Sequence, residues 1–230
     1  MYKNKKISLV IPCHNEERGI EKILSDRHDF IDEVIVVDNN STDETTNVAK
    51  RLGAKVIFEK KIGYGNAYLA GFKYATGDII VTMDGDDSYS IKEVPGLLKI
   101  LLDENLDFIS GCRFPLKEKR SMKHINRIGN FLLTLFFNIL VLKNIKDSQS
   151  GMWVFKKKIL SRINLTSAGM PFSEEIKMEI LLNKKIRFKE INIFYRERTG
   201  QVKLKIWRDG LLNMLFLFKK RFDLFLRISR

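Results

Sequence analysis

Cysteine is scarce in this sequence. Cys13 and Cys112 are the only two cysteines among 230 residues. Two thiols cannot form the disulfide framework of a small secreted protein, so we expect a chain that works in a reducing cytoplasm. Hydrophobic residues make up 44% of the chain, and charged residues are not gathered into low-complexity tracts. This composition predicts a folded chain with a sizeable core and goes against global disorder.

Long hydrophobic runs are also missing. No stretch reaches the roughly 18 apolar residues that a membrane-spanning helix needs. The first twelve residues, MYKNKKISLVIP, do not resemble a signal peptide, because their apolar run is short and polar residues soon follow. The longest apolar segment, FLLTLFFNILVL at 131–142, is too short to cross a bilayer. We expect it either to form a buried helix or to lie in a membrane interface.

Glycine-rich phosphate-binding motifs do not occur. The segment PCHNEERG at 12–19 is not Gly-x-Gly-x-x-Gly, and GYG at 63–65 lacks the third glycine and the acidic partner of that motif. There is no Walker A loop. Cys13 beside His14 lacks the further ligands of a zinc site. These absences disfavour a dinucleotide-dependent dehydrogenase, a P-loop enzyme and a zinc protein.

Positive charge is what the sequence has in excess. Its 41 Lys and Arg residues outnumber 28 Asp and Glu, which gives a net charge of +13. The excess lies in segments 113–146 and 184–230, with net charges of +7 and +10, so the rest of the chain is net acidic. A basic back half indicates a polyanionic partner: nucleic acid, an anionic membrane surface or a phosphorylated substrate. No nucleic-acid-binding motif occurs, so we expect no nucleic acid.

The first 111 residues alternate between apolar runs and helical patterns. Continuous apolar strands separated by helices predict an α/β fold with a mostly parallel sheet flanked by helices. The predicted strands are ISLVIP (7–12), EVIVVD (33–38), AKVIFEK (54–60), DIIVTMD (78–84) and LDFISGCR (106–113).

The rhythm changes after residue 113. The predicted elements there are a helix in 117–142, a short strand at 151–157, a helix at 173–185, an antiparallel strand at 186–198 and an amphipathic helix from Lys203. There is no internal repeat and no linker, so we expect one domain over residues 1–230.

Two carboxylates follow the predicted strand 78–84. Ligands of parallel sheets bind beyond the carboxyl ends of the strands, where Asp84 and Asp86 would lie. Their spacing allows both to approach one divalent cation, which would also take oxygen from a substrate phosphate. The alternative is an acidic turn that caps a helix, a role that suits Asp87 or Ser88. Asp38 similarly either accepts a hydrogen bond from a base or ribose or only shapes its turn.

Several segments carry a family resemblance in their order along the chain. They are VIPCHNEE (10–17), VIVVDNNSTDET (34–45), GYGNAYLAGFKYATGDIIVTMDGD (63–86) and FISGCRF (108–114). Together they resemble the family 2 glycosyltransferases, whose GT-A fold is Rossmann-like. Two later segments, DSQSGMWVF (147–155) and INIFYRERTGQVKL (191–204), resemble the branch that makes polyprenyl-phosphate sugars, such as the dolichyl-phosphate mannose synthases.

The resemblance implies a metal-dependent, inverting transfer of a hexose from a nucleotide-diphosphate sugar such as GDP-mannose or UDP-glucose. Residues 1–113 would bind this donor and residues 114–230 the acceptor. The implied donor-binding residues are Pro12, His14, Glu16, Asp38, Gly65, Asp84, Gly85 and Asp86. Mg²⁺ or Mn²⁺ would bind Asp84 and Asp86. Ser88 would be a third ligand, and it stands where the family often has a longer glutamine.

The acceptor side can be argued from its chemistry. A polyprenyl phosphate is already ionised at neutral pH, so it needs cations that orient it and no strong base. The resemblance favours Arg113, Arg127, Arg198 and Lys203 as acceptor-phosphate ligands, although Val202 replaces the serine that is usual in that motif. We expect Arg113 to act in catalysis together with Asp84 and Asp86.

Two alternatives remain open for the activity. A hydroxyl acceptor would need a general base, for which Asp147 is the candidate, unless Asp147 only caps a loop. The chain could also bind a sugar nucleotide without catalysis.

The amphipathic segments bear on location. The apolar segment 131–142 with the basic run before it, and the segment 211–228, suit the headgroup layer of a membrane. We therefore expect a peripheral protein at the cytoplasmic face of the membrane, with or without a membrane partner protein. The alternatives for both segments are core helices or a dimer contact.

Overall fold

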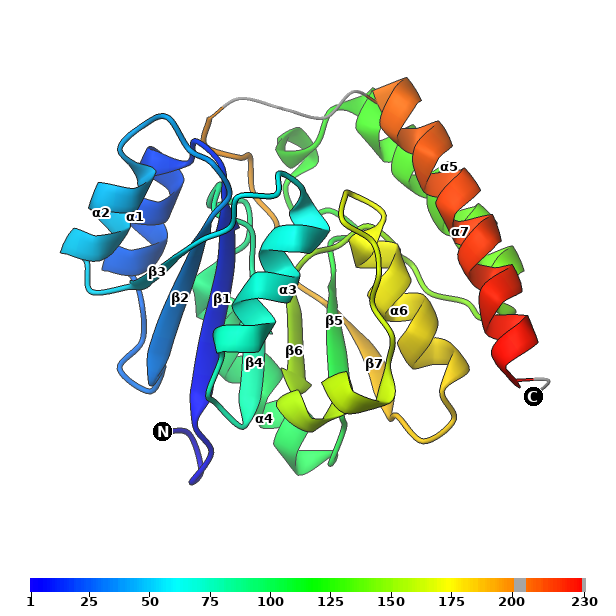
Figure 1. Ribbon diagram of the computed structural model, residues 1–230, viewed down its shortest axis with the longest axis horizontal. Coiled ribbons are helices and arrows are strands. Elements are labelled where there is room, and N and C mark those ends of the chain that lie inside the picture. The colour runs from blue at the N-terminus through cyan, green and yellow to red at the C-terminus, as the bar shows by residue number, and fades with distance from the viewer. Residues whose placement is uncertain (201–205, 229–230) are drawn as a thin grey trace.

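A seven-stranded sheet forms the centre of the molecule in the computed structural model (Figure 1), which describes residues 1–200 and 206–228. The strand order is β3-β2-β1-β4-β6-β5-β7. The strands are β1 (Ile7–Cys13), β2 (Glu33–Asp38), β3 (Lys55–Phe58), β4 (Ile79–Thr82), β5 (Phe108–Cys112), β6 (Trp153–Lys156) and β7 (Phe188–Asn192). All neighbours pair in parallel except β6, which is antiparallel to both β4 and β5. The predicted mostly parallel sheet is confirmed.

The direction of β7 was predicted wrongly. The alternating segment 186–198 is expected to be antiparallel, but β7 runs parallel to β5, with Phe108 opposite Phe188. The alternation has another cause: β7 is an edge strand whose residues are only partly covered. The antiparallel strand is β6, because residues 147–151 reach the sheet at the edge where β4 and β5 end, and the chain must then run back. That connection puts residues 147–151 at the carboxyl edge of the sheet.

Helices cover both faces of the sheet. The helices α1 (Glu17–Ser25), α2 (Thr45–Arg51) and α4 (Val94–Asp103) contribute to one apolar core, which includes Leu9 and Val81. The helices α3 (Tyr64–Tyr74) and α6 (Phe172–Leu182) contribute to a second core around Trp153. Short 3₁₀ turns lie at Ile91–Glu93, Lys119–Ser121 and Lys157–Arg162. The functional edge is thus held between two packed layers.

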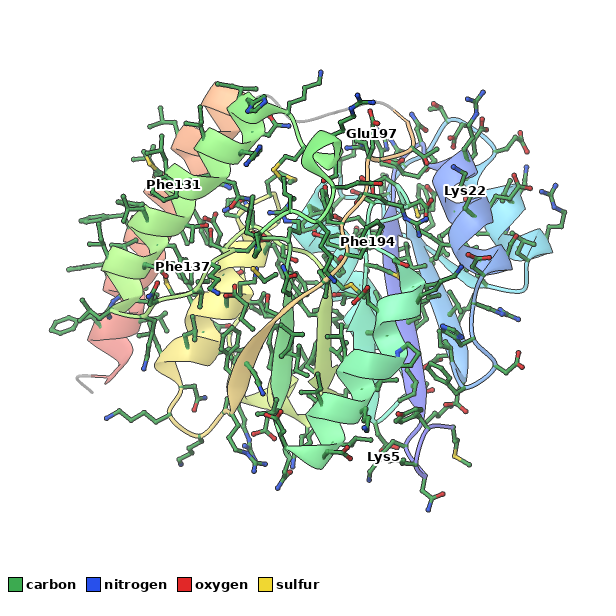
Figure 2. The ribbon with its side chains drawn as sticks, turned by 180° about the vertical axis from the view of Figure 1, so that it is seen from behind. Lys5, Lys22, Phe131, Phe137, Phe194 and Glu197 are labelled. Carbon is green, nitrogen blue, oxygen red and sulfur yellow. The ribbon has the colours of Figure 1, made fainter. Side chains whose placement is uncertain are left out.

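Two further helices, α5 (His124–Val141) and α7 (Ile206–Ile228), form a layer outside α6 (Figure 1). Phe137, Val141, Met178 and Leu217 form the small core that joins this layer to α6. Figure 2 shows α5 at the outer edge of the molecule, where Phe137 is buried and Phe131 is exposed. Both segments are helical, as predicted, while the basic character expected of the C-terminal helices stays a prediction.

The apolar segment 131–142 contains the second half of helix α5, which lies within the predicted helical segment 117–142. Since α5 begins at His124, it has 18 residues with a mean hydropathy of 1.2, and 22% of this window is buried. Among the described residues, α5 is long and apolar enough to cross a membrane by length and composition. The expectation that this segment is too short to cross a bilayer considered 12 residues, whereas α5 has 18. The core helix of a soluble protein also passes this test of length and composition.

Candidate active site

The first two strand-to-helix turns are bound to each other. The backbone N–H of Asn39 donates to the carbonyl of Cys13 at 2.8 Å, and Nδ1 of His14 lies 2.9 Å from the carbonyl of Asn39. The backbone N–H of Asn15 donates to the Ser41 hydroxyl. Parallel strands bring these turns to one edge, as the sequence predicts. Pro12 lies within β1 opposite Val37 and is half-buried, beside the same turns.

Asp38 is buried at the end of β2, and both of its oxygens accept local hydrogen bonds. Oδ1 accepts from the Ser41 backbone N–H, and Oδ2 accepts from the Thr46 hydroxyl, both at 2.9 Å. These contacts support the turn-shaping role of Asp38. A carboxylate oxygen can accept a further hydrogen bond, so its contact with a base or ribose stays a prediction.

Asn39 is a central residue of this edge, although it is not among the predicted site residues. Its Nδ2 donates to the carbonyls of Glu59 and Lys61, both at 2.9 Å, and its Oδ1 accepts from the Gly63 N–H at 2.7 Å. One buried amide therefore joins the end of β3 to the start of α3. The signal for it in the sequence is a polar residue directly after a buried strand.

Asp84 is held by two tyrosines of α3. Oδ1 accepts hydrogen bonds from the Tyr64 hydroxyl at 2.9 Å and the Tyr68 hydroxyl at 3.4 Å. Burial and the neighbouring charge of Asp86 raise the pKa of Asp84 to about 7. Glycine at position 151 leaves room for this arrangement, because an added Cβ would lie 2.2 Å from the Tyr64 hydroxyl. The repulsion between the charges of Asp84 and Asp86, which contributes to the raised pKa, indicates a site that is completed by a positive charge.

Asp86 is buried and held from two sides. Its Oδ1 accepts from the Ser88 hydroxyl at 2.6 Å and from the Ser88 backbone N–H. Its Oδ2 lies 3.5 Å from Nη2 of Arg198, which also donates to Glu16 at 3.0 Å. Arg198, from the segment after β7, is thus placed beside the acidic pair by Glu16 of the first strand-to-helix turn. Ser88 orients Asp86 in this geometry, and its contact with a metal stays a prediction.

The segment after β7 lies along the turn that carries the acidic pair. Tyr195 forms an isolated antiparallel bridge with Tyr89, and the Thr199 N–H donates to the Asp86 carbonyl at 2.8 Å. Arg196 pairs with Asp87 at 3.2 Å, which supports a local role for Asp87. Through these contacts the basic segment of the back half meets the acidic front half.

Two predicted donor-site glycines have packing reasons for being glycine. A Cβ on Gly85 would lie 2.5 Å from Sγ of Cys13, and one on Gly65 would lie 2.0 Å from the Ser167 carbonyl oxygen. Both distances are too short for a real contact. The close approach of a donor to Gly65 and Gly85 stays a prediction.

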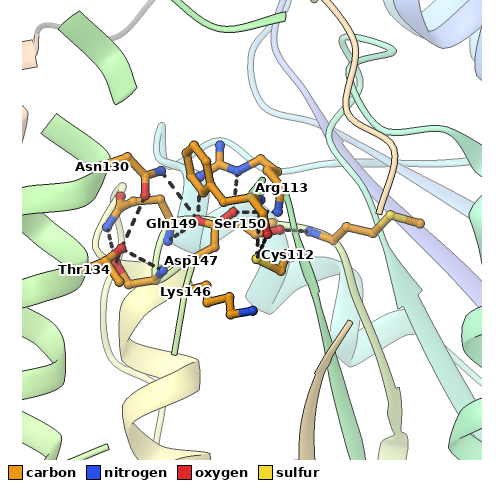
Figure 3. Close-up of polar contacts among 12 residues, drawn as sticks. Cys112, Arg113, Asn130, Thr134, Lys146, Asp147, Gln149 and Ser150 are labelled. Atoms are coloured by element: carbon orange, nitrogen blue, oxygen red, sulfur yellow. Dashed lines mark hydrogen bonds and ion pairs between the residues drawn. The ribbon is translucent and has the colours of Figure 1, made fainter. Parts of the chain in front are cut away.

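Arg113 and Asp147 form a buried ion pair (Figure 3). Nε and Nη2 of Arg113 donate to the two carboxylate oxygens at 2.7 and 2.8 Å, and its backbone N–H donates to Oδ2 at 3.0 Å. Burial alone would raise the pKa of Asp147, but Arg113 outweighs it and lowers that pKa to about 2. The guanidinium also lies over the Tyr195 ring at 5.3 Å. Asp147 therefore carries a fixed negative charge that orients Arg113.

Charged residues of α6 support this pair, and the sequence does not single them out. Lys177 is fully buried and donates to the carbonyls of Asp147, Ser148 and Ser150 at 2.9–3.0 Å. Burial lowers the pKa of Lys177 to about 8 and raises that of Glu174, also fully buried, to about 8. The only signal in the sequence is that charged and apolar residues alternate in SEEIKMEI, so that charges fall on the sides of the helix that also carry its apolar residues.

The remaining predicted acceptor ligands are less constrained. Arg127 is half-buried on the first turn of α5, and its side chain forms no hydrogen bond or ion pair with another described residue. Lys203 and Val202 lie outside the described residues. Both cysteines are buried thiols, in line with the expected absence of a disulfide.

Solved structures with the same arrangement define the class of fold. A crystal structure of glucosyl-3-phosphoglycerate synthase from Mycobacterium tuberculosis with Mn²⁺, UDP and phosphoglyceric acid matches with a TM-score of 0.76 and 22% identity, covering 95% of this chain and 79% of that chain. The same enzyme with Mg²⁺ and UDP matches with a TM-score of 0.74 and 21% identity, covering 93% and 79%. This likeness shows the fold alone, which is the GT-A fold of glycosyltransferases.

The chain belongs to the glycosyl transferase family 2, because the model of that family matches residues 8–163. It is 34% identical to the low-salt glycan biosynthesis hexosyltransferase Agl6 of Haloferax volcanii, over 92% of this chain and 52% of that protein. It is 30% identical to a dolichyl-phosphate hexose transferase of the same organism, over 89% of both chains. The chain thus spans about half the length of Agl6 and most of the second relative.

Proposed function

We propose that this protein transfers a hexose, with inversion, from a nucleotide-diphosphate sugar to a polyprenyl phosphate such as dolichyl phosphate. The choice of a phosphate acceptor rests on the ionised and fully paired carboxylate of Asp147. Its carboxylate is fully buried, both oxygens accept from Arg113, and its pKa is about 2. Such a group cannot accept a proton from a hydroxyl near neutral pH. A phosphate acceptor needs no base, and the dolichyl-phosphate hexose transferase relative supports the same choice.

The acidic pair fits a divalent cation on the donor side. Among the residues that the structure describes, no three His, Cys, Asp or Glu side chains gather into a metal site. Asp84 and Asp86 would therefore share Mg²⁺ or Mn²⁺ with the donor diphosphate, as these cations commonly do. When bound, the metal would offset the negative charge of the departing diphosphate. The Tyr64 hydroxyl and Ser88 hold the two carboxylates in place for this purpose.

Arginine side chains act on the acceptor side in this proposal. Asp147 accepts hydrogen bonds from Nε and Nη2 of Arg113. The third guanidinium nitrogen of Arg113, Nη1, forms no hydrogen bond with a described residue. Arg198 stands beside Asp86, and Arg127 lies on the first turn of α5. These guanidinium groups would bind the acceptor phosphate and orient it for in-line attack on the sugar.

The direct test is product analysis with the intact protein. Incubation with labelled UDP- and GDP-hexoses, Mg²⁺ or Mn²⁺, and dolichyl phosphate is expected to give chloroform-soluble label. Omitting dolichyl phosphate is the control and is expected to abolish that product. Label found only in water-soluble glycosides contradicts the proposal and favours a hydroxyl acceptor. Donor binding without turnover on any acceptor would favour a binding module. Thermal shifts with UDP and GDP in the presence of Mn²⁺ identify the donor base.

The outer face of α5 and α7 provides a surface for a membrane in this proposal. Its exposed apolar side chains are Ile125, Ile128, Phe131, Leu132, Leu135, Ile139, Leu211, Leu212, Leu215, Phe218, Phe222 and Phe225. Exposed cations border this face at Lys123, Lys143 and Lys219. Such a face suits the headgroup layer of an anionic membrane, which is where a polyprenyl phosphate presents its charge. We therefore place the protein peripherally at the cytoplasmic face of a membrane.

Charges on this face are expected to prevent membrane binding. Replacing Phe131 and Phe218 together by glutamate should lower partition into vesicles of anionic lipid by about 1,000-fold, because each ring loses about 2 kcal/mol of apolar burial and about 1.4 kcal/mol is a factor of ten. Vesicle sedimentation measures the effect. Phe58→Glu is the matched control, since Phe58 is similarly exposed but lies on β3. Equal partition of the double variant and the control would refute the proposed surface.

A further inference from the structure

Lys220 is a buried cation on the outer helix α7. It is 4% exposed and lies 2.8 Å from both Glu175 and Glu179 of α6. It also donates to the Asn164 carbonyl at 2.5 Å. Its neighbour Lys219 is exposed. Burying one ammonium group between two carboxylates costs desolvation energy, so the arrangement calls for an explanation beyond the apolar packing of α7.

Glu175, which contacts Lys220, also binds the loop at residues 166–167. Its carboxylate is fully buried and accepts from the Thr166 backbone N–H at 2.9 Å, the Thr166 hydroxyl at 2.8 Å and the Ser167 backbone N–H at 2.9 Å. Three donors on one carboxylate fix the conformation of residues 166–167. Lys220 stabilises the negative charge on which these hydrogen bonds depend.

The same loop packs against the start of α3. The Asn66 backbone N–H donates to the Ala168 carbonyl at 3.1 Å. The Ser167 and Ala168 carbonyl oxygens lie so close to Gly65 and Gly63 that an added Cβ would be 2.0 and 2.2 Å away. A contact this close leaves the start of α3 no room to shift toward the loop.

The start of α3 in turn reaches the donor side of the candidate active site. The Gly63 N–H donates to Asn39 at 2.7 Å, and the Tyr64 hydroxyl donates to Asp84 at 2.9 Å. A continuous series of hydrogen bonds and packed backbone thus connects Lys220 to Asp84. The series runs through α7, α6, the loop and α3.

We propose that Lys220 is a positioning residue for the donor site. Through Glu175 and the 166–168 loop, the contact of α7 with α6 fixes the position of the start of α3, whose Tyr64 holds Asp84. This inference rests on the proposed function, because the site it affects is the one assigned to the nucleotide-sugar. The outer layer then does more than cover α6. A disturbance of α7 changes the affinity for the donor, and donor binding steadies the 166–168 loop, since coupling between two sites is reciprocal.

The test is nucleotide binding by variants of the full chain. Lys220→Met is expected to weaken binding of UDP or GDP with Mg²⁺, measured by calorimetry, by about tenfold, because two carboxylates are left buried side by side. Lys219→Met is the matched control and should bind like the wild type. Lys220→Arg, which keeps the charge, should restore most of the affinity. Glu179→Gln, which keeps the contact between Lys220 and Glu175, should have a small effect. Affinity of Lys220→Met equal to that of the wild type overturns the inference.

A second measurement covers the case in which Lys220→Met does not fold. Hydrogen exchange of the wild type is expected to slow at the Thr166 and Ser167 amides, which donate to Glu175, when nucleotide and Mg²⁺ are added. No change at these amides would overturn the inference while leaving the proposed function intact. If the wild type binds neither nucleotide, the proposed function falls as well, so the two failures are distinguishable.

Discussion

Replacing Asp84 with asparagine is expected to lower the rate of hexose transfer by about 1,000-fold. Asparagine keeps the shape of the side chain and the oxygen that accepts from Tyr64 and Tyr68. It removes one of the two charges that would hold the cation and, through it, the diphosphate. Losing electrostatic stabilisation of this kind raises the activation barrier by several kcal/mol. Initial rates with labelled donor over a range of Mg²⁺ and Mn²⁺ concentrations measure the loss. The variant should also lose the metal dependence of donor binding.

The same substitution is expected to raise the thermal stability of the metal-free protein. Burial and Asp86 raise the pKa of Asp84 from an ordinary value near 3.8 to about 7. The folded state therefore holds a proton that the unfolded state releases, and stability falls as the pH rises from about 4 to about 7. Asparagine carries no charge at any pH, so the gain in Tm should be largest at pH 8. Added Mn²⁺ should stabilise the wild type and have little effect on the variant.

Asp87→Asn provides the control for both readouts. Asp87 lies in the same turn and pairs with Arg196, and its φ of 61° is one that asparagine tolerates well. We expect transfer by this variant to stay close to that of the wild type. An Asp84→Asn variant with an unchanged rate and metal dependence would refute the metal assignment. A variant that loses both rate and thermal stability would instead indicate a structural role for Asp84.

The strands of the sheet could be read from the sequence because burial on both faces demands continuous apolar runs. EVIVVD and DIIVTMD show this directly, and β2 and β4 lie within them. The carboxyl ends of such strands share one edge, so the neighbourhood of Asp38, Asp84 and Asp86 followed from topology alone. The direction of a strand cannot be read in the same way. The alternation in 186–198 indicates that the strand is partly exposed, and an edge strand is partly exposed whether it is parallel or antiparallel.

Much of the candidate site depends on contacts that no local pattern encodes. Tyr64 and Asp84 are 20 positions apart, and Glu16 and Arg198 are 182 apart. The buried charges of α6 were the hardest to foresee. In sequence, Glu174 and Lys177 suggest a solvated helix face, and only the placement of α7 and the 147–151 segment around α6 buries them. The hydrogen-bond acceptors of Lys177 are backbone carbonyls, which carry no signal of residue type.

Loss of the Arg113 side chain is expected to have the second large effect. In Arg113→Met, Asp147 stays buried without its partner, which should lower the free energy of unfolding by about 3–5 kcal/mol and Tm by about 10 °C. Asp147 has a folded pKa of about 2, below its ordinary value, so in the wild type its stabilising contribution is present above pH 4 and is lost as the pH falls toward 2. This loss in acid should be absent from the variant. Thermal unfolding between pH 2 and pH 7 measures both effects.

A double variant separates stability from function. Arg113→Met with Asp147→Leu replaces the ion pair by apolar side chains, and such replacements of buried pairs are often neutral or stabilising. We expect Tm to recover toward that of the wild type while transfer to dolichyl phosphate stays about 100-fold low, because Arg113 would no longer orient the acceptor phosphate. Recovery of both Tm and transfer would contradict the acceptor role and make the pair purely structural. Arg187→Met, which removes an arginine paired with Asp107 outside the site, is the matched control and should keep both.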